Sequence, residues 1–230
     1  MEAGLSSAGV GRAALAALTA PLLAGFINRT KAVLAGRRGQ PLLQAYHDLF
    51  KLLGKGAVYS RTTTWVFRAG PVVQLACAAA AVSLLPMGSR PALLAFPGDF
   101  ICLAGLLALM RFSAVTAALD TGSSFEGMGA SREAAFAALA EPVFLLSLAV
   151  LARVTGALSL SDMSARLAAQ GAPGFGPVLA LAALALFGVL LTENSRMPVD
   201  DPNTHLELTM NHEVMVLDHG GPDLAFIQYA

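Results

Sequence analysis

The sequence predicts an all-α integral membrane protein, because its composition, its hydropathy and the spacing of its charges all differ from those of soluble domains. Of the 230 residues, 56% are hydrophobic and only 13% are charged, and the mean hydropathy is +0.64. Soluble domains usually contain about a quarter charged residues. A formal net charge of zero argues against a basic nucleic-acid-binding protein, and two cysteines argue against a disulfide-stapled secreted domain.

Five charge-poor stretches have the length, or nearly the length, needed to cross a bilayer. A hydrocarbon core of about 30 Å requires roughly 20 mostly apolar residues in a helix. Two of these stretches contain one internal arginine each, Arg111 in the third and Arg153 in the fourth. Such an arginine either neutralises a buried carboxylate or extends to the membrane surface, and both interpretations stay open here. The predicted spans cover residues 13–27, 69–89, 100–119, 142–161 and 177–192.

The distribution of lysine and arginine predicts that the N-terminus faces away from the cytoplasm, because positive charges near span ends are retained on the cytoplasmic side. The connection between the first two spans is rich in both residues, whereas the opposite side has only Arg90 and Arg166. The first residues lack the basic start of a signal peptide, so we expect the first apolar stretch to remain as a helix. Most acidic residues also fall on the cytoplasmic side, which suits either a docked soluble partner or a proton-loading site.

Residues 40–55 are predicted to form an amphipathic helix in the membrane interface on the cytoplasmic side. Pro41 suits the first helical position and Gly54 suits the helix end. The segment is too charged to span a membrane, so we place it in the interface plane; a surface helix covered by a partner is the alternative. Its apolar residues recur at spacings of four, three and four: Leu42, Tyr46, Leu49 and Leu53.

Two further polar segments, 119–142 and 193–222, are predicted to be loops on the cytoplasmic side. The first is read as a Gly/Ser loop followed by an Ala-rich helix that leads into the fourth span. It places Glu141 at the membrane mouth, where a carboxylate is either functional or a solvated charge at a helix start. The second contains Thr204-His-Leu-Glu207, a capping box that predicts the start of a helix.

Histidines and glutamates gather in the second of these segments. His205, His212 and His219 follow one another at intervals of seven, which would place them on one helical face. Without HExxH or a thiolate ligand, the pattern does not predict a metal site. Clustered Glu and His beside a span favour a proton-relay or gating role, and surface docking is the simpler alternative. Glu193 and Arg196, three residues apart, are predicted to form a coupled pair.

Long motifs in these segments carry a resemblance that begins near Ala20 and covers nearly all of the remaining chain. They read Gly39-Gln-Pro-Leu-Leu-Gln44, Asp48-Leu-Phe-Lys-Leu-Leu53, Ser60-Arg-Thr-Thr63, Leu119-Asp-Thr-Gly-Ser-Ser-Phe-Glu-Gly-Met-Gly-Ala-Ser-Arg-Glu133, Leu139-Ala-Glu-Pro142, Arg196-Met-Pro-Val-Asp200, Thr204-His-Leu-Glu-Leu-Thr-Met210 and His212-Glu213. Together they resemble the membrane subunit of formate hydrogenlyase and related energy-converting (group 4) NiFe hydrogenases. That subunit is similar to subunit 1 of respiratory complex I, the NADH dehydrogenase subunit 1 family.

The resemblance implies a non-catalytic subunit of a multi-pass complex in a bacterial or archaeal inner membrane. It would dock the hydrogenase large and small subunits and an iron-sulfur subunit, beside antiporter-like membrane subunits in the lipid bilayer. It would couple their electron transfer to proton or sodium translocation. His205 and His212 are expected to assist the residues that match the family's ion pathway. Those residues are Glu141, Glu193, Asp200, Glu207 and Glu213, with Arg196 as a basic partner.

No redox cofactor is expected in this subunit, because no residue pattern supplies a ligand set for nickel, iron-sulfur or haem. The NiFe centre and the iron-sulfur clusters would belong to partner subunits. After Met197-Pro198 the chain reads Val-Asp-Asp-Pro, where complex I typically has Phe-Asp-Leu-Pro, which favours the hydrogenase branch over quinone binding. We expect a single membrane domain over 1–230 that is C-terminally short for the family, with a sixth span starting at Asp223. A purely structural anchor and a quinone-site subunit are the alternatives.

Overall fold

The structure is a computed structural model, and it describes residues 7–88, 90–170, 176–194 and 211–230. Across these residues it contains nine helices and no strand longer than one isolated bridge, which confirms the predicted all-α class. The helices are α1 (Ser7–Leu34), α2 (Gln44–Leu53), α3 (Trp65–Leu84), α4 (Asp99–Asp120), α5 (Ser124–Thr155), α6 (Leu160–Gln170), α7 (Gly176–Glu193), α9 (Asn211–Met215) and α10 (Gly221–Tyr229).

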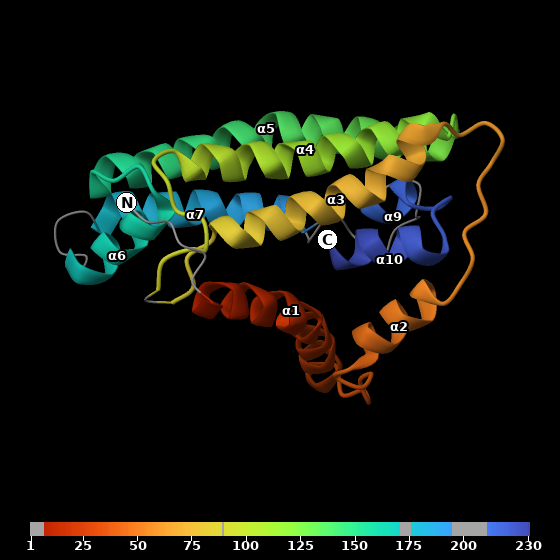
Figure 1. The fold of residues 1–230 in the computed structure, drawn as a ribbon, viewed down its shortest axis with the longest axis horizontal. Helices are drawn as coiled ribbons and strands as arrows, with labels where there is room; N and C mark the ends of the chain where they lie inside the picture. Colours follow the sequence, from red (N-terminus) through yellow and green to blue (C-terminus); the bar gives the residue numbers. More distant parts are fainter. Residues whose placement is uncertain (1–6, 89, 171–175, 195–210) are drawn as a thin grey trace.

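Five of these helices, α1, α3, α4, α5 and α7, are long and apolar enough to cross a membrane. Figure 1 shows α3, α4, α5 and α7 running side by side as an elongated bundle, with α9 and α10 at one end and α6 at the other. α1 and α2 lie along one side of the bundle. Most large apolar side chains of the long helices remain exposed, as expected for surfaces that face lipid.

The helices of the bundle approach one another closely where small residues face each other, and they pack apolar side chains at the α6 end. Gly70 of α3 lies so near α4 that a Cβ atom there would come within 2.8 Å of the Cβ of Ala117. Phe100 and Leu148 pack with Ala157 and Met163 at the α6 end of the bundle. Small residues at helix crossings allow backbones to approach closely, which drives helix association in membranes.

Carboxylates at both ends of α4 connect it to its neighbours. Asp99 is fully buried and accepts hydrogen bonds from the Ser159 hydroxyl (2.7 Å) and from the Leu160 N–H (2.8 Å), which caps α6. Asp120 accepts from the N–H groups of Thr64 (2.7 Å) and Phe67 (3.2 Å) at the start of α3. Acidic side chains satisfy the free N–H groups of a helix start and interact favourably with its dipole.

The segment 119–142 differs from its prediction, because its Gly/Ser part is helical from Ser124 onward and only residues 121–123 are not. After a turn at Gly122, whose φ is 70°, α5 begins at Ser124 and runs for 32 residues through Pro142. The Ala-rich sequence supplies a helix propensity that outweighs the glycines at its start. Glu141 therefore lies inside a long helix and not at a helix start.

The other differences concern helix bounds. α2 begins at Gln44, three residues after Pro41, and ends before Gly54 as predicted. The fourth span ends at Thr155 because Gly156, at φ 65°, stops α5. The short helix α6 that follows was not predicted, since its few residues lie between two apolar stretches. The helix start predicted at Thr204 lies outside the described residues.

Candidate functional site

Arg111 lies in α4 and forms ion pairs with three carboxylates from two other helices. Its Nε lies 3.1 Å from Oε1 of Glu133, and its Nη1 lies 2.7 Å from Oε1 of Glu141; both glutamates belong to α5. Its Nη2 bonds Oε1 of Glu193, the last residue of α7. Each nitrogen of one guanidinium group thus bonds a different carboxylate, an arrangement that the planar fork of arginine permits and a lysine ammonium does not reproduce.

The three carboxylates differ in their exposure to solvent. The side chains of Arg111 and Glu133 are 10% and 8% exposed, whereas those of Glu193 and Glu141 are 33% and 43% exposed. Three carboxylates against one guanidinium leave an excess of two negative charges in this Arg111 cluster. Such an arrangement of charges in a partly dehydrated site can bind a cation.

One histidine borders the cluster. Nε2 of His212, in the short helix α9, lies 3.9 Å from Oε2 of Glu133. This nitrogen is buried and has no hydrogen-bond partner among the described residues. Glu133 therefore faces Arg111 with one oxygen and His212 with the other, and it is the member that joins the ion pairs to a titratable ring outside the spans.

Two cavities meet at the cluster. The larger, of about 680 Å³, is lined by Arg111, Glu133 and Glu193 together with His212 and Glu213. The smaller, of about 250 Å³, lies between α4, α5 and α7; its lining includes Glu141 and is otherwise mostly apolar. Arg111 and Glu193 contribute to the walls of both cavities. The ion pairs consequently lie where two mostly apolar cavities meet, and the larger of these has more charged residues in its lining.

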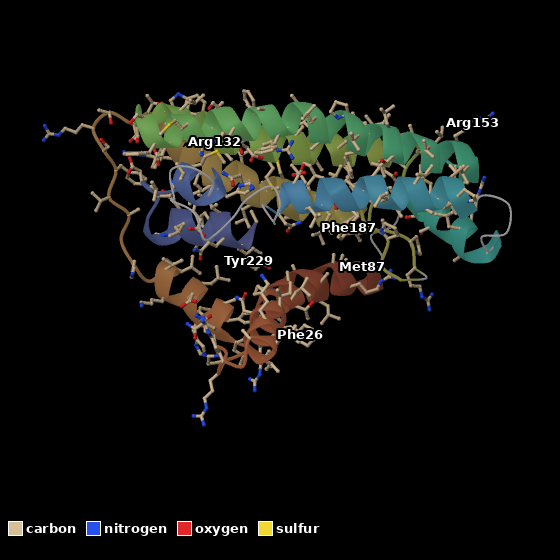
Figure 2. All side chains as sticks on the ribbon, turned by 180° about the vertical axis from the view of Figure 1, so that it is seen from behind. Phe26, Met87, Arg132, Arg153, Phe187 and Tyr229 are labelled. Carbon is tan, nitrogen blue, oxygen red and sulfur yellow. The ribbon has the colours of Figure 1, made fainter. Side chains whose placement is uncertain are left out.

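The structure brings some of the predicted site residues together and places others apart. Glu141 and Glu193 meet at Arg111, and His212 lies beside Glu133, while Glu213 is exposed at the larger cavity. Arg153 is exposed, and Figure 2 shows it near the end of α5 opposite to Arg132. The other predicted site residues lie outside the described part of the chain: Arg196, Asp200, His205 and Glu207.

Two features of the site were missed or left open by sequence reasoning. Glu133 was noted only as part of a motif, although its spacing of eight residues from Glu141 places both on one face of a continuous helix. Because a Gly/Ser loop was predicted before Glu133, this spacing was not used. Arg111 had two open interpretations, and the structure shows the first of them, the neutralisation of carboxylates. The partner of Glu193 in the described residues is Arg111, and the predicted partner Arg196 is outside them.

A second polar group, which we call the His219 cluster, joins α10 to the start of α3. The buried ring of His219 stacks on Phe67 at 3.9 Å between centroids, and Tyr59 meets the edge of Phe67 at 6.3 Å. The guanidinium carbon of Arg68 lies 4.3 Å above the Tyr59 ring. A hydrogen bond with Asp223 raises the pKa of Tyr59, and burial lowers the pKa of His219 from its ordinary 6.5. Among the described residues, no group of three or more His, Cys, Asp or Glu could hold a metal ion.

The lowered pKa of His219 predicts that the protein loses stability in mild acid. Below about pH 6.5 the imidazole of His219 takes up a proton more readily in the unfolded chain than in the buried ring of the folded protein. The contribution of His219 to the free energy of unfolding is therefore fully present above this pH and is lost as the pH falls. The measurement is the unfolding temperature in detergent between about pH 7.5 and pH 5.5. His219→Phe, which keeps the stack on Phe67, is expected to flatten this dependence. His47→Phe, at an exposed histidine of α2, is the control; an equally steep dependence in His219→Phe would contradict the assignment.

Comparison with known proteins shows what the chain is similar to. The family model described as NADH dehydrogenase matches residues 10–230. Formate hydrogenlyase subunit 4 of Escherichia coli (strain K12) is 41% identical over 145 residues, which are 63% of this chain and 47% of that protein. Hydrogenase-4 component C of the same organism is 33% identical over 218 residues, 95% of this chain and 68% of that protein. The chain thus spans about half the length of the first relative.

A solved structure shares the fold. A chain in the structure of the membrane-bound sulfane sulfur reductase, an archaeal respiratory membrane complex, superposes with a TM-score of 0.80 at 22% sequence identity. The superposition covers 96% of this chain and 71% of that one. At this identity the likeness concerns the arrangement of the helices alone.

Proposed function

Since the chain belongs to the NADH dehydrogenase family, we propose that it is the membrane subunit of a respiratory-type hydrogenase complex that couples electron transfer to the translocation of protons or sodium ions. The multi-pass helical fold and the names of the two Escherichia coli relatives support the type of complex. The observation that carries the coupling role is the Arg111 cluster, in which one guanidinium is shared by three carboxylates between two cavities.

The cluster has the geometry of a relay. Glu133 and Glu141 are eight residues apart on α5, which separates their backbones by about 12 Å at 1.5 Å per residue. Arg111 bonds both, so a cation bound at one carboxylate is exchanged for one at the other when the guanidinium changes partner. In this proposal cations enter from the larger cavity, whose lining includes His212 and the exposed Glu213. A change of charge or conformation in the polar segments 119–142 and 193–222 then alters how many cations the cluster holds.

The partners and cofactors follow from the same proposal. The polar side of the protein docks the hydrogenase large and small subunits and an iron-sulfur subunit, and antiporter-like subunits adjoin it in the membrane. The NiFe centre and iron-sulfur clusters reside in those partners, no redox centre is expected in this chain, and the Val-Asp-Asp-Pro sequence argues against quinone binding. The N-terminus faces away from the cytoplasm, which places the basic connection around α2 on the cytoplasmic side.

The decisive experiment compares wild type with Glu193→Gln in membrane vesicles. We expect the variant to assemble and to keep its hydrogen turnover, because the amide still accepts a hydrogen bond from Arg111, while the ion gradient is lost because one exchangeable carboxylate is gone. Turnover is measured with and without an uncoupler, and assembly is checked on a native gel. Asp162→Asn, at an exposed carboxylate of α6, is the matched control. If Glu193→Gln leaves both turnover and gradient unchanged, the assignment of Glu193 to the coupling path falls and the structural-anchor alternative gains.

A further inference from the structure

α1 has a defect in its backbone hydrogen bonding at its centre. Pro21 lies inside this helix and has no N–H group, so the carbonyl of Ala17, four residues earlier, has no helical donor. In a lipid environment no water replaces that donor, and an unsatisfied carbonyl there is strongly unfavourable. Figure 1 shows α1 bending in its middle.

Two tyrosines from distant parts of the chain donate to this turn of α1. The Tyr229 hydroxyl, at the end of α10, donates to the carbonyl of Ala17 at 2.8 Å, which is the group that Pro21 leaves without a partner. The Tyr46 hydroxyl, in α2, donates to the next carbonyl, that of Leu18. Figure 2 shows Tyr229 on the part of the bundle that lies over α1. The carbonyls of this turn are thus satisfied from two other helices.

The same turn is supported from within α1. The hydroxyl of Thr19 donates to the carbonyls of Leu15 (2.9 Å) and Ala16 (3.2 Å). Three hydroxyl groups therefore serve the four successive carbonyls of residues 15–18, and the single proton of Thr19 is shared between two of them. Side-chain donors at a proline kink satisfy the groups that the kink exposes and hold its angle.

The two halves of α1 have different supports. The first half borders the end of α3, where Arg12 and Ala13 form a small pocket with Val82 and Leu85. The second half contacts the segment before α2 so closely that a Cβ atom at Gly25 would overlap the Leu42 carbonyl. Only 11% of the α1 span is buried, so packing alone holds it weakly. The bend at Pro21 is where these two halves meet.

We infer that Tyr46 and Tyr229 form a clasp that fixes the angle of α1 at Pro21 and joins α10 mechanically to α1 and α2. The cleft of about 460 Å³ between these three helices is lined by Pro21 and Tyr229, with Gln44, Asp48 and Gln228. A movement of α10, whose first turn carries Asp223, the hydrogen-bond partner of Tyr59, is therefore transmitted to the kink and to the width of this cleft. The inference concerns the helices alone and stands whether or not the protein moves ions.

The clasp is tested by removing each hydroxyl while keeping its ring. The complete protein, with its native assembly partners in lipid nanodiscs, is compared with Tyr229→Phe, Tyr46→Phe and the double variant by amide hydrogen exchange. Exchange in peptides around Pro21 is expected to accelerate about tenfold in Tyr229→Phe and further in the double variant, because the turn opens more readily. Peptides of α4 keep their wild-type rates. Thr116→Val, which removes a hydroxyl group within α4 and outside the clasp, is the control. Unchanged exchange in the double variant overturns the inference.

A second comparison tests whether the Tyr229 hydroxyl is needed because Pro21 lacks an N–H group. Pro21→Ala restores the N–H group that bonds the Ala17 carbonyl, so the hydroxyl of Tyr229 becomes redundant for that group. Tyr229→Phe is therefore expected to accelerate exchange in the wild-type background and to have no effect in the Pro21→Ala background, a coupling that a double-mutant cycle measures directly. An equal acceleration in both backgrounds means that Tyr229 stabilises α1 by other contacts, and the clasp is then wrong.

Discussion

Arg111→Leu is expected to destabilise the protein more than any other single substitution in the membrane bundle. The change leaves three carboxylates without their shared cation, and the side chain of Glu133 is only 8% exposed. Removing one partner of a buried ion pair costs about 3–5 kcal/mol, because the remaining charge is uncompensated. The measurement is the unfolding temperature and the assembly of the complex in detergent. Arg111→Lys restores the charge but not the fork geometry, so we expect it to be intermediate.

Two comparisons separate this effect from a general loss of packing. Arg153→Leu removes an arginine from another span, at an exposed position, and is expected to change stability by less than about 0.5 kcal/mol. Combining Arg111→Leu with Glu133→Leu replaces the most buried pair by apolar groups, which is often neutral. The double variant is therefore expected to be more stable than Arg111→Leu alone. A double variant that is less stable than the single one would show that the ion pair is not the source of the loss.

Much of the fold was predictable because membrane spans are determined by length and hydropathy. The long apolar stretches required helices, and all five predicted spans correspond to helices in the structure. Helix ends were predicted less well, since they depend on local turns such as the one at Gly156 and on capping partners from other helices. Asp120, for example, caps α3 across more than 50 residues of sequence, a contact that no local pattern contains.

The candidate site was predictable in its components but not in its connections. Glu141 was singled out because a carboxylate at a membrane mouth is expensive to dehydrate. Glu193 was singled out because it matches an acidic position of the family and lies three residues from Arg196. Their common partner was not apparent, because the pairing depends on how α4, α5 and α7 are rotated against one another. Glu133 escaped notice because the Gly/Ser sequence before it suggested a loop, whereas a continuous helix places it and Glu141 on one face.

Glu133→Gln is expected to slow ion translocation strongly while the protein still assembles. Glu133 is the carboxylate that contacts both Arg111, at 3.1 Å, and His212, at 3.9 Å, so it links the cluster to the histidine that lines the larger cavity. Glutamine keeps the size of the side chain and an oxygen that accepts from Arg111, but it does not take up a proton at neutral pH. The rate of gradient formation is expected to fall roughly tenfold or more, which corresponds to about 1.4 kcal/mol at the transfer step.

The control for this prediction is Glu213→Gln, because Glu213 lines the same cavity but is exposed and lies outside the Arg111 cluster. Water replaces an exposed carboxylate as a proton donor, so its loss is expected to slow gradient formation by much less than the loss of Glu133. Both variants are assayed in the same vesicles at equal hydrogen turnover. If Glu133→Gln and Glu213→Gln reduce the gradient equally, the entry of ions depends on the total charge of the larger cavity and not on Glu133 in particular. If neither variant reduces the gradient, the ions move by another route. The ion pair of Glu133 with Arg111 then serves only to hold α4 and α5 together.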